Sequence, residues 1–280
     1  MSRRAVVTAL PMVVLGGRAA AREPLRLGLT PVFLDSDLAL LRALEAYLGR
    51  ATGFAPELVK RRTYQEITAL LLAGRLDAAW ICGYPFVEHA DRLALVAVPL
   101  HRGSPLYRSY LIVPADSGAE RLEDLRGTTH AFSDPASNSG YLVTRHRLLL
   151  DGERPETFFA RSFFTFGHRN VIRAVAAGLA DGGSVDGYVW EVMARREPAI
   201  AGATRVLEAS EWFGFPPIAA LAAQRRSPAV EALARALVAM PQDPLGREIL
   251  AVLDLDGFVP GEPILYAGIA AMRERLRAEG

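Results

Sequence analysis

The 280-residue sequence has almost no cysteine and no excess of either charge. Its 32 Lys and Arg residues balance 31 Asp and Glu residues, so the formal net charge is only +1 and no broad polyanion-binding surface is indicated. Binding to nucleic acid is therefore not expected. The single cysteine, Cys82, excludes an intramolecular disulfide, so its thiol is either buried or functional.

Signatures of common enzymes and metal sites are also missing. The sequence contains no Gly-x-Ser-x-Gly nucleophile elbow, and its five His residues do not have the spacing of metal ligands. We therefore expect no enzymatic activity, no bound metal and no other cofactor. Internal repeats and low-complexity linkers are absent, and no stretch after residue 21 is long and apolar enough to span a membrane.

The first 21 residues are typical of an export signal. Arg3 and Arg4 form a basic start, residues 5–15 form an apolar core too short to cross a bilayer, and Ala19-Ala20-Ala21 offers a cleavage site. No lipoprotein cysteine follows the apolar core, so a lipid anchor is not expected. The sequence predicts a protein that is exported and soluble once residues 1–21 are removed. The general and the twin-arginine export routes both stay open.

After the signal, strand and helix patterns alternate along the chain. Strand patterns occur at residues 25–29, 58–60, 76–82, 107–113, 128–132, 161–166, 184–188, 205–209 and 218–222. Helix patterns occur at residues 37–48, 63–73, 141–150, about 170–179 and 189–196, and in three C-terminal segments. Thr63-Tyr64-Gln65-Glu66 is a capping box, and Ser227-Pro228, Asp243-Pro244 and Glu262-Pro263 are candidate helix starts with an N-cap followed by Pro. This alternation is the pattern of parallel sheets covered by helices, and it predicts an α/β fold.

The alternation stops at Pro114 and then starts again, which predicts two lobes. Lobe 1 is expected to comprise residues 25–108 and 213–280, and lobe 2 residues 109–212, with two crossover strands joining them around a cleft. Ligands of open α/β sheets bind beyond the carboxyl ends of the strands. The polar segments at those ends are residues 30–37, 82–85 and 133–140, Gly167-His168 and Asp186-Gly187.

The segment Ser137-Asn138-Ser139-Gly140 stands at the predicted start of the helix over 141–150. Backbone N–H groups at a helix start lack partners, and the helix dipole is positive there, so an anion is favoured. The two hydroxyls add donors, and Gly140 allows a ligand to approach the backbone closely. Ordinary N-capping explains the same residues. The position of the segment at a strand end favours the anion site.

The order and spacing of four segments resemble those of the PhnD-like family, the periplasmic proteins that bind phosphate, phosphite and phosphonate for ABC importers. The segments are YQEITALLLAGRLDAAWICGYPFV, YRSYLIVPADSG, LEDLRGTTHAFSDPASNSGYLV and FFTFGHRNVIRAVAAGLADGGSVDGYVW. The resemblance covers nearly all of the chain after the signal. It implies a two-lobed periplasmic binding protein that closes on a small oxyanion, acts as a monomer and delivers the ligand to an ABC permease.

The resemblance also implies the residues that bind the ligand. It assigns the oxyanion to Ser137, Asn138 and Ser139, although the middle residue of the family is usually Thr. It gives ligand roles to His168 and Asp186. The structural alternatives are that His168 caps or packs against a helix start and that Asp186 is a turn residue. Asp186 would accept a hydrogen bond from a protonated oxygen, and it would reject fully ionised, sulfate-like ligands because a carboxylate would then stay unpaired.

Three further candidates come from lobe 1. Tyr64 matches a ligand-facing tyrosine of the family. Where the family usually has Gly-Pro after its third strand, this chain has Cys82-Gly83-Tyr84-Pro85, which adds Cys82 and Tyr84 to the predicted site. Both tyrosines are equally explained as half-buried aromatics, and Cys82 as a small buried hydrophobe.

Cys82 also supports a second function. Relatives within the family bind arsenic oxyanions through a cysteine and signal to a histidine kinase. A soft thiolate suits arsenite better than it suits phosphate. A periplasmic oxyanion sensor that uses Cys82 and a sensor kinase therefore stands as the alternative to an importer.

Overall fold

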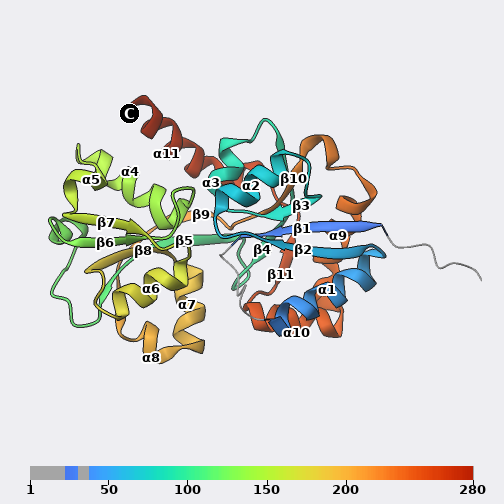
Figure 1. Cartoon of the computed structure of the whole chain (residues 1–280), viewed down its shortest axis with the longest axis horizontal. Helices are drawn as coiled ribbons and strands as arrows, with labels where there is room; N and C mark the ends of the chain where they lie inside the picture. Colours follow the sequence, from blue (N-terminus) through green and yellow to red (C-terminus); the bar gives the residue numbers. More distant parts are fainter. Residues whose placement is uncertain (1–22, 31–37, 280) are drawn as a thin grey trace, which may run out of the picture.

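Two β-sheets, one in each lobe, organise the chain (Figure 1). The computed structural model describes residues 23–30 and 38–279. The predicted export signal and the predicted site residues 31–37 lie outside the described residues. The neighbouring Thr30 is described and buried, and its hydroxyl donates to the carbonyl oxygen of Trp80 at 3.1 Å.

The sheet of lobe 1 has six strands in the order β11-β4-β10-β3-β1-β2. The strands are β1 (Pro24–Leu29), β2 (Ala55–Lys60), β3 (Ala78–Trp80), β4 (Leu93–Leu100), β10 (Ile218–Leu221) and β11 (Gly257–Val259). The helices around them are α1 (Leu38–Thr52), α2 (Tyr64–Leu72), α3 (Gly83–Glu88), α9 (Pro228–Ala239), α10 (Pro244–Leu253) and α11 (Ala267–Ala278). β1 pairs in parallel with β2 and β3, so the carboxyl ends of these strands face the second lobe.

The sheet of lobe 2 has five strands in the order β7-β6-β8-β5-β9. The strands are β5 (Leu106–Pro114), β6 (Thr129–Phe132), β7 (Arg161–Phe164), β8 (Gly182–Asp186) and β9 (Thr204–Gly214). Its helices are α4 (Val143–Leu150), α5 (Pro155–Phe158), α6 (His168–Ala176), α7 (Gly187–Arg196) and α8 (Pro198–Ala201), and a π-helical turn spans Asn138–Leu142. Short 3₁₀ segments lie at Leu122–Leu125, Ala222–Gln224, Met240–Gln242 and Pro263–Tyr266.

The chain passes from one lobe to the other twice. It leaves lobe 1 after β4 and enters lobe 2 at β5, and it returns between β9 and β10. The prediction of a two-lobed α/β fold is confirmed. α11 follows lobe 1 in the chain but lies against both α3 and α4, so it bridges the two lobes (Figure 1). Within the described residues, no helix has the length and apolar character that a membrane crossing needs.

Local signals located the helix starts well. Thr63 and Glu66 form the predicted capping box, in which the Thr63 side chain accepts from the Glu66 N–H and the Glu66 carboxylate accepts from the Thr63 N–H. Ser227 and Asp243 cap α9 and α10 through their side chains, each followed by Pro at the first helical position. At Glu262 the predicted cap opens only a 3₁₀ segment, without a side-chain hydrogen bond.

Five helices and strands of the structure were not predicted from the sequence: β4, β11, α3, α5 and α8. β4 was not predicted, because its run LALVAVPL contains a proline and does not alternate. Residues 83–85 were expected only to follow the end of a strand, but they form the first turn of α3. Pro85 is compatible with a helix there, since N–H groups of the first turn have no intrahelical acceptor.

Candidate functional site

Polar side chains from both lobes meet in one buried cluster between the two sheets. The buried polar cluster consists of Tyr64, Cys82, Tyr107, Ser109, Ser133, Asp134, Ser137, Asn138, Ser139, His168 and Asp186. Each of these residues is at most 4% exposed, so each polar atom must find a partner inside the protein or in a ligand. Seven of the nine ligand candidates predicted from the sequence belong to it, and Gly140 lies against it.

The Ser-Asn-Ser-Gly segment forms a π-helical turn that leads into α4. Ser137 is its N-cap, and the Ser137 Oγ accepts the N–H of Gly140 at 3.0 Å. The Ser139 Oγ, by contrast, is buried without a hydrogen-bond partner among the described residues. The two serines therefore differ: the Ser137 hydroxyl caps the helix start, whereas the Ser139 hydroxyl has no partner among the described residues.

Gly140 is packed too tightly to carry a side chain. A Cβ atom at this position would lie 1.8 Å from the Oγ of Ser133 and 3.0 Å from the Cε1 of His168. The Ser133 Oγ also lacks a hydrogen-bond partner among the described residues. The glycine thus allows the turn to approach Ser133 and His168, which brings two unpartnered serine hydroxyls into one cluster.

The hydrogen bonds of His168 fix its protonation. The backbone N–H of Asp186 donates to the His168 Nδ1 at 3.0 Å, so Nδ1 carries no proton. Complete burial lowers the pKa of His168 to about 3, and the neutral ring must then carry its proton on Nε2. That Nε2 lies 3.2 Å from the Tyr64 hydroxyl and donates to it. The Tyr64 hydroxyl accepts in this hydrogen bond, so its own O–H remains available as a donor.

Asp186 is the N-cap of α7 and keeps one carboxylate oxygen free. Its Oδ1 accepts the N–H groups of Tyr188 at 2.9 Å and Val189 at 3.3 Å. Its Oδ2 is buried and has no partner among the described residues. Burial raises the pKa of Asp186 to about 7, against the two backbone hydrogen bonds that lower it. This carboxyl group can therefore hold or release a proton near neutral pH.

Two hydrogen bonds from backbone N–H groups to side chains connect the lobes within the cluster. The N–H of Tyr64 donates to the Asp134 Oδ2, and the N–H of Asn138 donates to the Cys82 Sγ, each at 3.2 Å. The Asn138 side-chain amide donates to the Tyr107 hydroxyl at 3.0 Å, a contact that the shorter Thr of the family would not make. The lobes are thus closed on each other in this structure.

The thiol of Cys82 is neutral at physiological pH. Burial raises its pKa to about 11, although the hydrogen bond from the Asn138 N–H acts in the opposite direction. Thiolate is the form that binds soft metalloid ions and reacts with electrophiles. The environment of Cys82 therefore favours a hydrogen-bond acceptor over a reactive group.

Tyr84 does not join the cluster, contrary to the prediction. Because residues 83–88 are helical, successive side chains point about 100° apart, so Cys82 faces inward while Tyr84 faces outward. Tyr84 is half-buried in a separate, open pocket of about 570 Å³ that it shares with Tyr141, Arg145 and Arg273. The helix that the sequence analysis missed is the reason for the wrong placement.

Four members of the cluster were not singled out from the sequence. Tyr107 and Ser109 lie two residues apart on β5, so they share one face of the strand. Ser133 and Asp134 follow the carboxyl end of β6, within the polar segment already recognised as a strand end. Alternation along β5, combined with the carboxyl-end rule, is the signal that would have identified them.

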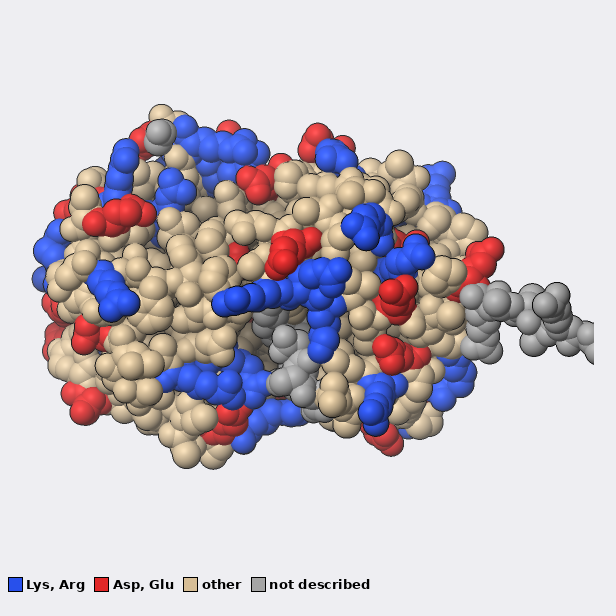
Figure 2. All heavy atoms as spheres, viewed as in Figure 1, with Lys and Arg blue, Asp and Glu red and all other residues tan. Residues whose placement is uncertain are grey.

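Among the described residues, no positively charged side chain enters the buried polar cluster. None of the described Lys or Arg residues is buried, and the one histidine of the cluster, His168, is neutral. Figure 2 shows a hollow between the lobes with Lys and Arg side chains along its border. Such a border attracts anions, while hydroxyls and oriented N–H groups bind them. Among the described residues, no three His, Cys, Asp or Glu side chains are placed to hold a metal ion.

Known proteins share the sequence and the fold of this chain in part. A phosphate-import protein, PhnD, from Mycolicibacterium smegmatis is 29% identical over 174 residues, which are 58% of this chain and 54% of that protein. The matched region thus spans about half the length of that relative. A binding-protein component of an ABC phosphonate transporter from Pseudomonas aeruginosa has the same fold, with a TM-score of 0.81 and 20% identity over 90% of this chain and 86% of that one.

PhnD1 from Prochlorococcus marinus, solved in complex with methylphosphonate, also shares the fold, with a TM-score of 0.80 and 17% identity over 91% of this chain and 98% of that one. The family described as the periplasmic substrate-binding protein of the phosphonate ABC transporter matches residues 27–266, most of the chain. The chain therefore belongs to the family of periplasmic substrate-binding proteins of phosphonate ABC transporters.

Proposed function

We propose that this protein captures a small phosphorus oxyanion (a phosphonate, phosphite or phosphate) in the buried polar cluster and delivers it to an inner-membrane ABC permease. One observation carries the proposal. Four polar atoms of the cluster are buried without partners among the described residues: the Oγ atoms of Ser133 and Ser139, the Oδ1 of Asn138 and the Oδ2 of Asp186. An unsatisfied buried polar atom costs about 1–3 kcal/mol, so four in one cluster are consistent with a site for a polar ligand.

The chemistry of the cluster fits an oxyanion that carries one proton. The hydroxyls of Ser133, Ser139 and Tyr64 are donors, and they suit the charged oxygens of the ligand. Asp186 offers a carboxyl oxygen that can share a proton with one further oxygen. Above about pH 7, where Asp186 is ionised, a ligand that brings no proton, such as sulfate, would face a buried carboxylate with no hydrogen between the two oxygens.

Capture in this protein combines binding with lobe closure. Tyr64 and Cys82 come from lobe 1, whereas Asp134, Asn138 and Asp186 come from lobe 2. A ligand held between them would connect the lobes, and the closed shape is what we propose the permease recognises. One chain supplies every group of the cluster, which supports action as a monomer in the periplasm.

The buried state of Cys82 supports import over sensing. The thiol accepts the Asn138 N–H, and burial raises the pKa of Cys82 far above neutral pH. Arsenite binds thiolate sulfur, and within the described residues no second cysteine is available. The sensor alternative would need this thiol to become exposed and ionised.

Exchanging Cys82 for Ser tests the two functions against each other. A serine hydroxyl also accepts the Asn138 N–H, so Cys82→Ser should change the affinity for methylphosphonate by less than about tenfold, or about 1.4 kcal/mol. Calorimetric titration of wild type and variant with methylphosphonate and with arsenite measures both ligands. Arsenite binding by wild type that the variant loses would support the sensor. Failure of wild type to bind methylphosphonate, phosphite and phosphate would reject the importer.

A further inference from the structure

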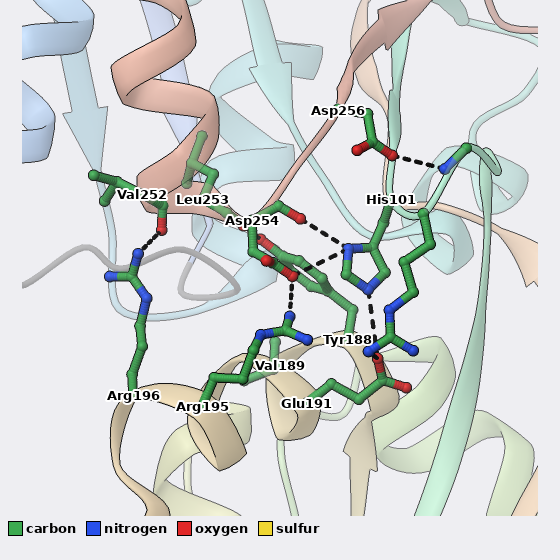
Figure 3. Close-up of polar contacts among 12 residues, drawn as sticks. His101, Tyr188, Val189, Glu191, Arg195, Arg196, Val252, Leu253, Asp254 and Asp256 are labelled. Atoms are coloured by element: carbon green, nitrogen blue, oxygen red, sulfur yellow. Dashed lines mark hydrogen bonds and ion pairs between the residues drawn. The ribbon is translucent and has the colours of Figure 1, made fainter.

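A second polar network joins the lobes outside the buried polar cluster (Figure 3). It connects α7 of lobe 2 with the end of α10 in lobe 1 and with His101, the first residue after β4. The Arg195 guanidinium forms an ion pair with the carboxylate of Asp254. The Tyr188 hydroxyl donates to the carbonyl of Leu253, and the Arg196 side chain donates to that of Val252.

His101 lies at the centre of this network. Its Nδ1 is 2.8 Å from the carbonyl oxygen of Asp254 and 3.4 Å from the Asp254 Oδ2. Its Nε2 is 3.4 Å from the Glu191 Oε2. A carbonyl oxygen only accepts, so Nδ1 carries a proton. A neutral ring would then turn an unprotonated Nε2 toward a carboxylate. The geometry therefore suits the charged form of His101, which donates to one group from each lobe.

The surrounding residues hold Glu191 in place for this contact. The Tyr110 hydroxyl donates to the Glu191 Oε1 at 2.7 Å, and an Arg102 Nη2 lies 2.9 Å from its Oε2. On the other side, Asp254 has a left-handed backbone with φ 57°, a conformation that Asp tolerates better than most residues. This conformation is what allows its carbonyl and its carboxylate to face His101 together.

We propose that His101, Glu191, Arg195 and Asp254 form a clasp that holds the lobes closed and sets how long the bound ligand is retained, without touching the ligand. The inference rests on the proposed function. α7 links the two sites, because Asp186 caps its first turn and Glu191 follows five residues later on the same helix. Movement of α7 away from lobe 1 would break the clasp and withdraw Asp186 from the ligand together.

The exposure of the side chains indicates which contacts matter. Arg195 and Asp254 are 43% and 35% exposed, so their ion pair is screened and contributes little alone. His101 and Glu191 are 9% and 20% exposed, so their contact is much better shielded from water. Removing the Glu191 charge is therefore the change that should weaken the clasp most.

The clasp should depend on pH through His101. The ionisable groups around it are Glu191, Asp254, Arg102, Arg195, Tyr110, Tyr188 and the α7 cap Asp186. Burial lowers the pKa of His101, but the hydrogen bonds to Glu191 and Asp254 outweigh it and raise the pKa above the ordinary 6.5. A raised pKa means that the stabilisation is fully present below pH 6.5 and is lost as the pH rises through the raised value.

Small-angle scattering on unliganded Glu191→Gln tests the clasp independently of any ligand. The glutamine keeps the shape of the side chain and removes its charge. At about pH 6 the variant should have a larger radius of gyration than wild type, and wild type should expand between about pH 6 and 8 while the variant does not. Glu153→Gln is the matched control, because Glu153 is 28% exposed and pairs with Arg126 inside lobe 2. It should behave as wild type.

The ligand readout is the dissociation rate of methylphosphonate, which should rise about tenfold in Glu191→Gln and in Asp254→Asn but not in Glu153→Gln. Equal scattering of wild type and both clasp variants at about pH 6, with thermal melting showing that all are folded, would overturn the clasp. A wild type that binds no phosphorus oxyanion would reject the proposed function, while the scattering comparison would still decide the clasp.

Discussion

Asp186→Asn should weaken methylphosphonate binding by about 2–4 kcal/mol, because it removes a buried charged partner of the ligand. Asparagine keeps an oxygen that can accept from the N–H groups of Tyr188 and Val189, so the cap of α7 is retained. Its amide N–H can donate to an oxyanion that carries no proton. Above about pH 7, where Asp186 of wild type is ionised, the variant should therefore gain sulfate binding that wild type lacks. Calorimetric titration with both ligands measures this change of preference. A variant that keeps the preference of wild type would contradict the role of Asp186.

The same variant should lose the pH dependence of binding. Burial raises the pKa of Asp186 to about 7, so the neutral form is present below that value and is lost as the pH rises through it. The complex needs one proton between the carboxyl oxygen and the ligand. Above about pH 7, wild-type affinity should fall by up to about tenfold per pH unit, whereas Asp186→Asn should show only the titration of the ligand itself. Unliganded wild type should lose stability as the pH rises from about 4 to about 7, because the unfolded carboxyl group ionises near pH 4 whereas the buried one keeps its proton up to about pH 7; the variant should not.

Ser139→Ala should separate binding from stability. The Ser139 Oγ has no partner among the described residues, so its removal leaves no other group unsatisfied, and the melting temperature of the unliganded protein should not fall. A hydrogen bond to a charged group is worth about 1.5–3 kcal/mol, so the affinity for methylphosphonate should fall about 10- to 100-fold.

Ser137→Ala is the matched comparison for this turn. Ser137 accepts the Gly140 N–H as the N-cap, so its replacement should cost about 1 kcal/mol of unfolding free energy. Thermal unfolding and calorimetry on the two variants distinguish a hydroxyl kept for the ligand from one kept for the helix. If Ser139→Ala bound methylphosphonate as wild type does, the turn would be only a helix start.

The sequence was sufficient for the main features of the fold because its local signals are strong. The capping box at Thr63 and the Ser-Pro and Asp-Pro starts of α9 and α10 depend only on neighbouring residues, and the structure confirms them. Strand ends with polar residues, such as 133–140, indicated where the buried polar cluster forms. Tyr84 lies outside this cluster because α3, a helix that the sequence did not predict, turns its side chain away.

The clasp shows what the sequence alone does not contain. Glu191 and Asp254 lie 90 and 153 residues after His101 in the chain, and no local sequence pattern links the three residues. Their contact depends on the packing of α7 against the end of α10 and on the left-handed backbone of Asp254. The protonation of His168 is similarly a property of the fold, since it is fixed by the backbone N–H of Asp186.

The central claim is that the buried polar cluster binds a phosphorus oxyanion that shares one proton with Asp186. Calorimetric titration of the wild-type protein with methylphosphonate and with sulfate, from about pH 6 to about pH 9, tests it most directly. The predicted result is a methylphosphonate affinity that declines above about pH 7, with no heat of sulfate binding above about pH 7, where Asp186 is ionised. Sulfate binding as tight as methylphosphonate binding at about pH 8, or a methylphosphonate affinity that is independent of pH, would contradict the claim.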